Sequence, residues 1–350
     1  RKWMGVEGGF VGMIDPQSVV SLFSAPFNGQ DILDLHWDRF GERVLAVGGT
    51  RIFEWKEGNW TGLTETWDNS FFLTSVCSDS SGVVYTGGWN GLHIIDGSGI
   101  STLDTLNSQI PFNRLTGMDL APNGSLLLAG VDGEGFINLS VFNGSDFIEI
   151  YRDALEENFI YNDHFRVSSI SDNDTWLFTS MKGMVRLQGN DLLRASITHY
   201  TTFETGLPDD MVYAVEPWLG SGFYAGTQAG LARLNDGSYH NISISEGSVI
   251  LPGDAPWLRD IDLDSYGNIW LVNYGGISRI NGDQIIRFHS GNSHMTSDRA
   301  RMIHVTRKNT VYALTEGELF RLKNNTVEVF NLGNEGLPSY LTWHDMNSDS

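Results

Sequence analysis

A short glycine-containing block recurs along the chain and sets the strongest limit on its fold. Residues 267–277 combine an apolar run around Trp270 with paired glycines, and residues 82–92 and 221–231 match them without a gap. Weaker copies follow Leu45, Leu127, Leu177 and Tyr312. Such repetition indicates a fold built from similar units, each of which buries its apolar face against its neighbours.

Each unit reads as four short strands separated by tight turns. In the copy around Trp270, strand a covers 258–264 and strand b contains the tryptophan. Strand c covers 277–280, and strand d covers 284–288. Alternating apolar and polar residues, β-branched side chains and turns of Gly, Asn and Asp are typical of such strands. The sequence therefore predicts an all-β protein.

The spacing of the units indicates which all-β fold to expect. Strand a begins near residues 31, 72, 114, 165, 211, 257, 300 and 340, so the spacing is 40 to 51 residues. Four strands in a period of that length are the signature of a β-propeller. A β-sandwich would also explain the short strands, but it gives no reason for the recurring glycines. The sequence predicts an eight-bladed β-propeller of four-stranded antiparallel blades.

The eighth unit is divided between the two ends of the chain. Residues 340–350 read as strand a, whereas residues 1–30 read as strands b to d. Joined tail to head, they place Trp3 at the position of Trp270. We therefore expect a single domain over 1–350, closed by pairing of the N-terminal strands with the C-terminal strand a, which leaves no free sheet edge.

Charge and cysteine content exclude several kinds of function. The chain of 350 residues has 43 acidic and 22 basic side chains, a net charge of −21. Nucleic acids and anionic membranes both need a positive surface, so neither is expected as a partner. The one cysteine, Cys77, cannot form an intrachain disulfide or a cysteine-rich metal site. No apolar run is long enough for a membrane helix, so we expect no direct membrane insertion of this segment.

The repeat resembles the two-component regulator propeller repeat, in which Gly-Leu-Pro precedes strand a and a Gly-Thr-x-x-Gly-Leu block follows. Gly206-Leu207-Pro208 leads into 224–231, and Gly336-Leu337-Pro338 leads into the divided unit with Trp3 and Gly9. The resemblance implies a propeller from the sensing region of a bacterial hybrid histidine kinase, or a stand-alone surface or secreted protein. It therefore implies an extracytoplasmic location: secreted, periplasmic or on the cell surface. The family supplies no catalytic motif.

Aligning strand a across the units reveals a column of polar residues. Its members are His36, Cys77, Asp119, Ser169, Glu216, Asp262, His304 and Asp345. Strand a is innermost in a propeller, so these positions would form a ring around the central channel. The ring would suit a divalent cation such as calcium, a polar ligand or acid–base chemistry. A hydrated channel without a ligand explains the same pattern. The candidate ligand or metal residues are His36, Asp119, Glu216, Asp262, His304 and Asp345.

Two further sets of residues favour an exposed, exported protein. Trp89, Trp218, Trp257 and Tyr274 fall at loops, where a rigid scaffold often carries its binding residues. Asn-x-Ser/Thr sequons occur mostly in predicted turns, where a glycan could be attached. The candidate glycosylation sites are Asn59, Asn123, Asn143, Asn173, Asn241 and Asn324, and a further sequon begins at Asn138.

These features predict an exported, non-catalytic β-propeller at the cell surface. It would bind a protein or carbohydrate on one propeller face, as a sensor or as an envelope scaffold. The alternative is a polysaccharide lyase or hydrolase that uses His36, His304 and the channel carboxylates. An enzyme should bring a histidine and a carboxylate within hydrogen-bond reach, and the fold alone does not decide between the two.

Overall fold

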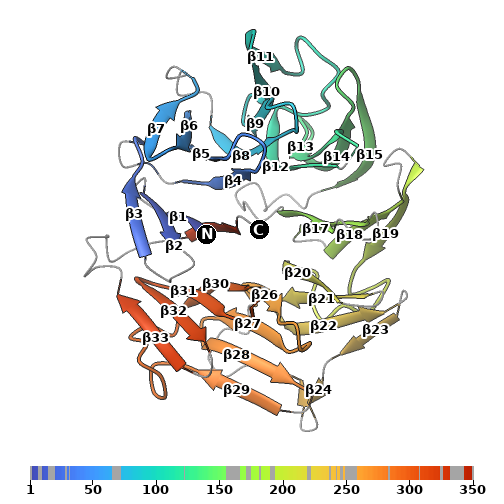
Figure 1. The fold of residues 1–350 in the computed structure, drawn as a ribbon. Helices are drawn as coiled ribbons and strands as arrows, with labels where there is room; N and C mark the ends of the chain where they lie inside the picture. Colours follow the sequence, from blue (N-terminus) through green and yellow to red (C-terminus); the bar gives the residue numbers. More distant parts are fainter. Residues whose placement is uncertain are drawn as a thin grey trace. The chain divides into compact units, whose positions relative to one another are not determined.

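The computed structural model describes most of the chain. The described residues are 2–6, 10–14, 20–27, 30, 32–64, 72–121, 123–154, 166–170, 175–180, 183–189, 194–218, 222–235, 238–241, 243–244, 247–248, 258–282, 284–306, 308–323, 326–331 and 343–348. Their regular structure consists of antiparallel β-strands (Figure 1). Within these residues no helix is long and apolar enough to cross a membrane.

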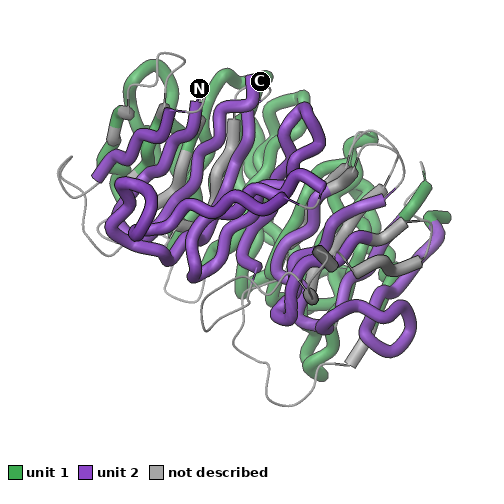
Figure 2. Tube along the Cα trace, turned by 90° about the horizontal axis from the view of Figure 1, so that it is seen from below, with its two compact units in different colours: residues 1–174, 188–195, 342–350 green, residues 175–187, 196–341 purple. Residues whose placement is uncertain are grey.

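The chain divides into two compact units, which Figure 2 shows in two colours. The first unit comprises residues 1–174, 188–195 and 342–350, and the second comprises 175–187 and 196–341. The first unit contains residues from both ends of the sequence, so it is not one continuous stretch of the chain.

Three blades of the first unit consist of four consecutive antiparallel strands. The first comprises β4 (Asp34–Asp38), β5 (Arg43–Gly48), β6 (Arg51–Lys56) and β7 (Asn59–Gly62). The second comprises β8 (Leu73–Ser78), β9 (Val84–Gly88), β10 (Gly91–Asp96) and β11 (Gly99–Leu103). The third comprises β12 (Arg114–Leu120), β13 (Leu126–Val131), β14 (Phe136–Phe142) and β15 (Phe147–Ala154).

Three blades of the second unit have the same organisation. The first comprises β20 (Val212–Trp218), β21 (Gly222–Thr227), β22 (Gly230–Asn235) and β23 (Ser238–Asn241), followed by a small hairpin of β24 (Ser243–Ile244) and β25 (Gly247–Ser248). The second comprises β26 (Asp260–Leu263), β27 (Ile269–Asn273), β28 (Gly276–Asn281) and β29 (Gln284–Phe288). The third comprises β30 (Ala300–Val305), β31 (Val311–Thr315), β32 (Glu318–Lys323) and β33 (Thr326–Asn331).

The structure corrects the expected number of blades. Counting as a blade four consecutive strands within one compact unit, the described residues form six, and the prediction of eight equivalent blades is wrong. Two further four-stranded sheets do not meet this description: one contains strands from both chain ends, and the division between the units cuts the other. The second of these comprises β16 (Arg166–Ile170), β17 (Thr175–Ser180), β18 (Gly183–Gln188) and β19 (Ser196–Tyr200). The division falls there because β16 packs beside β12 in the first unit, whereas β17 packs beside β20 in the second.

The pairing between the two ends of the chain is observed. The sheet order is β3 (Val20–Ser24), β2 (Phe10–Ile14), β1 (Lys2–Val6) and β34 (Trp343–Ser348), so the C-terminal strand adds to β1. All four strands belong to the first unit. This pairing does not test the prediction of one domain over 1–350, which stays a prediction.

The core of each unit lies between the faces of successive sheets. In the second unit, Trp270, Val272 and Ile277 pack with Ile303 and Phe320 of the following blade. In the first unit, buried side chains likewise join each sheet to the next: Trp3 with Leu35, Leu45 with Leu73, and Cys77 with Met118 lie in common clusters. Second strands such as β27 are buried throughout, because a neighbouring sheet covers each of their faces. This packing of four-stranded sheets is that of a propeller-type, all-β fold.

Candidate functional site

The polar column is real as a structural register in the six blades. Each of its members pairs directly with one residue of the adjacent second strand. The pairs are His36 with Leu45, Cys77 with Tyr85, Asp119 with Leu127, Glu216 with Tyr224, Asp262 with Trp270 and His304 with Tyr312. The first unit holds three of these six residues, and the second unit holds the other three.

The two remaining members of the column can be placed on their strands only. Ser169 lies in β16 and Asp345 in β34, but their side chains are outside the described part of the structure. In β34 the residue opposite Trp3 is Asn347, two positions after the expected Asp345. A tight turn fixes the register between the first and second strands of an ordinary blade, whereas no turn joins β34 to β1.

In the second unit, strand β26 uses its carboxylates to hold the next blade. Asp260 Oδ2 accepts a hydrogen bond from the backbone N–H of Ile303 at 3.0 Å. Asp262 Oδ2 accepts one from Val305 at 2.5 Å, while its Oδ1 accepts one from Leu263 at 2.7 Å. First strands of neighbouring blades are sheet edges, whose N–H groups need partners. These carboxylates supply such partners and thereby join β26 to β30.

The first unit repeats this arrangement at equivalent positions. Asp34, which corresponds to Asp260, accepts a hydrogen bond from the N–H of Val76 at 2.8 Å. His36, which corresponds to Asp262, lies with Nε2 3.0 Å from the hydroxyl of Ser78 in the next blade. Two residues predicted to face a channel, His36 and Asp262, therefore make contacts between blades. We call Asp34, His36, Asp260 and Asp262 the inter-blade clasp.

A third acidic position, two residues after the column, closes the turn between the first two strands. Asp264 Oδ2 accepts hydrogen bonds from Trp270 Nε1 at 3.0 Å and Asn268 Nδ2 at 2.7 Å. Asp79 similarly accepts from the hydroxyl of Tyr85 at 3.2 Å. Burial alone would raise the pKa of Asp79. The hydrogen bonds that Asp79 accepts from Ser81, Val83 and Tyr85 outweigh burial and lower this pKa. Sequence reasoning missed this role, although Asp38, Asp79 and Asp264 occupy equivalent positions.

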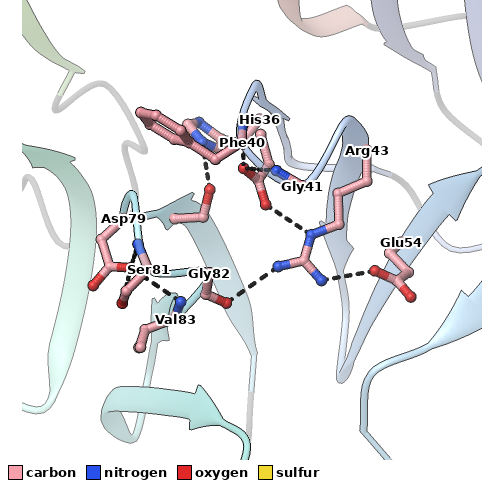
Figure 3. Close-up of polar contacts among 11 residues, drawn as sticks. His36, Phe40, Gly41, Arg43, Glu54, Asp79, Ser81, Gly82 and Val83 are labelled. Atoms are coloured by element: carbon pink, nitrogen blue, oxygen red, sulfur yellow. Dashed lines mark hydrogen bonds and ion pairs between the residues drawn. The ribbon is translucent and has the colours of Figure 1, made fainter.

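At the first of these turns, Arg43 adds a tie to the next blade. Its Nε lies 2.8 Å from Asp38 Oδ2, and its Nη1 lies 2.8 Å from Glu54 Oε2. Its Nη2 donates to the carbonyl of Gly82 in the following blade at 3.2 Å (Figure 3). Asp38 is buried, with 1% of its surface exposed, and its charge is held by the N–H groups of Gly41 and Phe40 together with this guanidinium.

Burial raises the pKa of two members of the column, the Cys77 thiol in the first unit and the Glu216 carboxyl in the second. Burial, together with the nearby charges of Asp262 and Asp260, raises the pKa of Glu216 to about 9. Glu216 is therefore protonated at neutral pH. In the first unit, burial lowers the pKa of His36, which keeps this imidazole neutral at pH 7.

One histidine–carboxylate pair lies within hydrogen-bond reach. His304 Nδ1 is 3.2 Å from Asp262 Oδ2, and the two side chains are 28% and 17% exposed. Together with the protonated Glu216, this pair has the chemistry of an acid–base site. Within the described residues, no group of three or more His, Cys, Asp and Glu side chains is placed to hold a metal ion.

Of the five exposed aromatic side chains among the described residues, Phe72, Trp89 and Phe203 lie at the end of the blades opposite the Asp264-type turns, whereas Phe40 and Tyr266 lie at those turns. In the first unit, Trp89 lies in the turn between β9 and β10 and is 52% exposed. Its ring centroid is 5.4 Å from that of Phe72, which is 39% exposed, and Arg114 Cζ lies 5.8 Å from its centroid. Leu106 belongs to the same end, because the loop that carries it bonds through Asn113 to Gly91 of the Trp89 turn.

The second unit carries the equivalent residues. Tyr274 lies in the turn between β27 and β28, and Arg299 Cζ is 5.8 Å from its ring centroid. Arg259 Nη2 also donates to the tyrosine hydroxyl at 2.8 Å. Phe203 occupies the place of Leu106 in a matching loop and is almost fully exposed. We call Phe72, Trp89 and Leu106 in the first unit, and Phe203 and Tyr274 in the second, the aromatic end of each unit.

The other predicted surface residues are only partly described. Trp218 ends β20 with its side chain undescribed, and Trp257 lies outside the described residues. Among the sequons, Asn59, Asn123 and Asn143 are exposed, whereas Asn138 is buried and donates its amide to Glu149. The side chain of Asn241 is undescribed, and Asn173 and Asn324 lie outside the described residues.

Comparison with known proteins shows the fold alone. No family model matches the chain, and no curated protein matches its sequence. Virginiamycin B lyase from Staphylococcus aureus is 12% identical over 80% of this chain and 90% of its own, with a TM-score of 0.53. A streptogramin B lyase is 12% identical over 94% of this chain and 99% of its own, also with a TM-score of 0.53.

A longer extracellular domain is also similar. The extracellular domain of a hybrid two component system from B. thetaiotaomicron is 11% identical over 95% of this chain, with a TM-score of 0.41. The present chain covers 56% of that chain. At such identities the coarser part of the predicted resemblance is what stands: this is an all-β chain of four-stranded, propeller-type blades.

Proposed function

We propose that the chain is an extracytoplasmic, non-catalytic binding protein that recognises its ligand at the aromatic end of its blades. The exposed Trp89 supports this proposal most directly. A solvated tryptophan at a turn, next to the partly exposed Phe72, is unfavourable for a purely structural surface. Loop residues on a rigid scaffold commonly carry binding functions.

The inter-blade clasp supports the same proposal from the other side. Asp260 and Asp262 each accept a hydrogen bond from a backbone N–H group of the next blade. His36 similarly bonds to Ser78. Polar residues that maintain blade packing are explained without a reaction, so the column by itself is weak support for an enzyme. Whether the bound ligand is sensed or anchors the protein in an envelope is a further question for the same assay.

Binding to whole cells tests the proposal. Fluorescently labelled protein would be added to intact cells of the source organism and compared with Trp89→Ala and Tyr274→Ala. Tyr266→Ala is the matched control, because Tyr266 is an 81% exposed aromatic at the opposite end of its blade. We expect the first two variants to lose surface binding and the control to keep it. Equal binding by all four proteins would refute the proposal.

A second candidate function has one specific observation in its favour. The His304–Asp262 pair and the protonated Glu216 form an acid–base set in the second unit. Two similar structures are lyases by name, so a fold of this kind can host an enzyme. On this reading the chain is a polysaccharide lyase or hydrolase with His304 as its base.

Activity on polysaccharides separates this candidate from the binding protein. Wild-type protein and His304→Ala would be incubated with neutral and acidic polysaccharides, and new reducing ends and unsaturated products would be measured. Turnover that His304→Ala abolishes and Trp89→Ala leaves in place would establish the enzyme. Absence of turnover on every polysaccharide, with binding retained, would reject it.

A further inference from the structure

We infer that Trp89 and Tyr274 are stacking platforms for the pyranose rings of a neutral polysaccharide. This inference rests on the proposed function and names its class of ligand. The two residues occupy the same place in blades of different units, each in the turn between the second and third strands. Each also has an arginine five residues before the column residue of the next blade, Arg114 before Asp119 and Arg299 before His304.

The two sites have matching geometry at the same register of two of the six blades. The guanidinium carbon lies 5.8 Å from the ring centroid in both Trp89–Arg114 and Tyr274–Arg299. A cation near an aromatic ring is attracted by the negative charge of its π face, so each arginine helps to hold its ring in place.

The backbone under Trp89 is held firmly. The Trp89 N–H donates to the carbonyl of Phe72 at 3.0 Å. The residue before it must be glycine, because a Cβ on Gly88 would lie 1.8 Å from that same carbonyl oxygen. A ring on a fixed turn loses little conformational freedom when a ligand stacks on it, which favours binding.

The chemistry of the platforms fits a sugar ring. The C–H groups on one face of a pyranose are weakly positive and apolar, and they complement the negative face of an indole or phenol. Half of the Trp89 surface is exposed, and the neighbouring Phe72 extends the flat apolar area. The Tyr274 ring is half-buried beside Arg259 and Arg299, so we expect it to contribute less than Trp89.

Size and charge decide against other ligands. A stable protein interface buries about 800 Å² on each partner, which is far more than the neighbouring rings of Trp89 and Phe72 can supply. The chain has a net charge of −21, which repels an acidic polysaccharide over long distances. In the second unit Arg299 is already 3.4 Å from Glu316, so its charge is compensated. A neutral polysaccharide meets neither obstacle.

Affinity electrophoresis tests the inference with defined probes. The protein would migrate through native gels containing dextran, mannan, xyloglucan or, as the acidic comparison, alginate. We expect retardation by at least one neutral polysaccharide, with apparent binding weakened about tenfold in Trp89→Ala, severalfold in Tyr274→Ala and not at all in Tyr266→Ala. Trp89→Phe should retain most of the binding, since an aromatic ring remains.

The outcomes distinguish failure of the ligand class from failure of the proposed function. Retardation that the Trp89 and Tyr274 variants leave unchanged would overturn the platforms, as would retardation by alginate alone. A photoactivatable phenylalanine at position 89 would also be used on intact cells. If no neutral polysaccharide retards the protein but this probe crosslinks to a surface protein, the carbohydrate inference fails and the binding function survives. If the protein neither binds a polysaccharide nor labels cells, both fail.

Discussion

Replacing Asp262 with alanine should open the contact between two neighbouring blades of the second unit. The substitution leaves the N–H groups of Leu263 and Val305 without their carboxylate, which accepts them at 2.7 and 2.5 Å. It also removes the partner of His304 at 3.2 Å. A buried N–H without a partner costs about 1–3 kcal/mol. Because the Asp262 side chain is 17% exposed, water replaces part of this loss. We therefore take the lower end for each N–H, about 2 kcal/mol in total.

Hydrogen exchange measures this cost where it arises. The lost hydrogen bonds lie at one contact between two blades, and exchange of the Val305 amide reports on that contact alone. A local cost of about 2 kcal/mol corresponds to about thirtyfold faster exchange of the Val305 amide. Asp262→Asn should fall between the wild type and Asp262→Ala, because an amide oxygen still accepts one hydrogen bond.

Glu204→Ala is the control, since Glu204 is an exposed carboxylate of the same unit. We expect it to leave the exchange of Val305 unchanged. Exchange of Val305 at the wild-type rate in Asp262→Ala would refute the clasp and return Asp262 to the set of candidate ligands.

Three further measurements follow from other contacts. Glu216 holds a proton in the folded state up to about pH 9 that the unfolded chain releases above its ordinary pKa of 4.5, so raising the pH through this interval lowers the free energy of unfolding. Glu216→Gln should therefore lose less thermal stability than the wild type on going from pH 5 to pH 9, and equal losses would contradict the raised pKa. Arg43→Met leaves the buried Asp38 without its guanidinium and should cost about 3 kcal/mol in urea unfolding; Arg39→Met, at an exposed position, is the control that must not match it. Expressed through a eukaryotic secretory pathway, the chain should carry N-glycans at Asn59, Asn123 and Asn143 and none at the buried Asn138, which peptide mass mapping would show or disprove.

The strands were predictable from the sequence because their signal is local. In the unit around Trp270, the expected fourth strand at 284–288 is observed as Gln284–Phe288, and the expected third at 277–280 lies within Gly276–Asn281. Alternation and turn residues determine such strands without reference to the rest of the chain. The grouping of the sheets into units is not a local property. The repeat predicts how many strands there are, whereas the division at β16 depends on which neighbour each strand packs against.

The candidate site was predictable as a column and not as a set of contacts. Aligning strand a placed Asp262 and His36 at equivalent positions, which the strand register bears out. Their partners, Val305 and Ser78, lie 43 and 42 residues further along the chain, and no pattern within one unit reveals them. The alternation of Asp260 and Asp262 was a usable signal, since two acids on one face of a strand meet the same neighbouring blade and need donors.

The pairing of β34 with β1 has a consequence for the order in which the molecule is made. About 320 residues separate the end of β3 at Ser24 from the start of β34 at Trp343. A ribosome adds about 5–20 residues per second, so β1–β3 wait roughly 15–65 seconds for their missing strand. The second unit lies wholly within 175–341 and is synthesised before that strand emerges. During synthesis β1 therefore presents an unpaired edge that a chaperone or another nascent chain can occupy, and the first unit cannot be completed before β34 emerges.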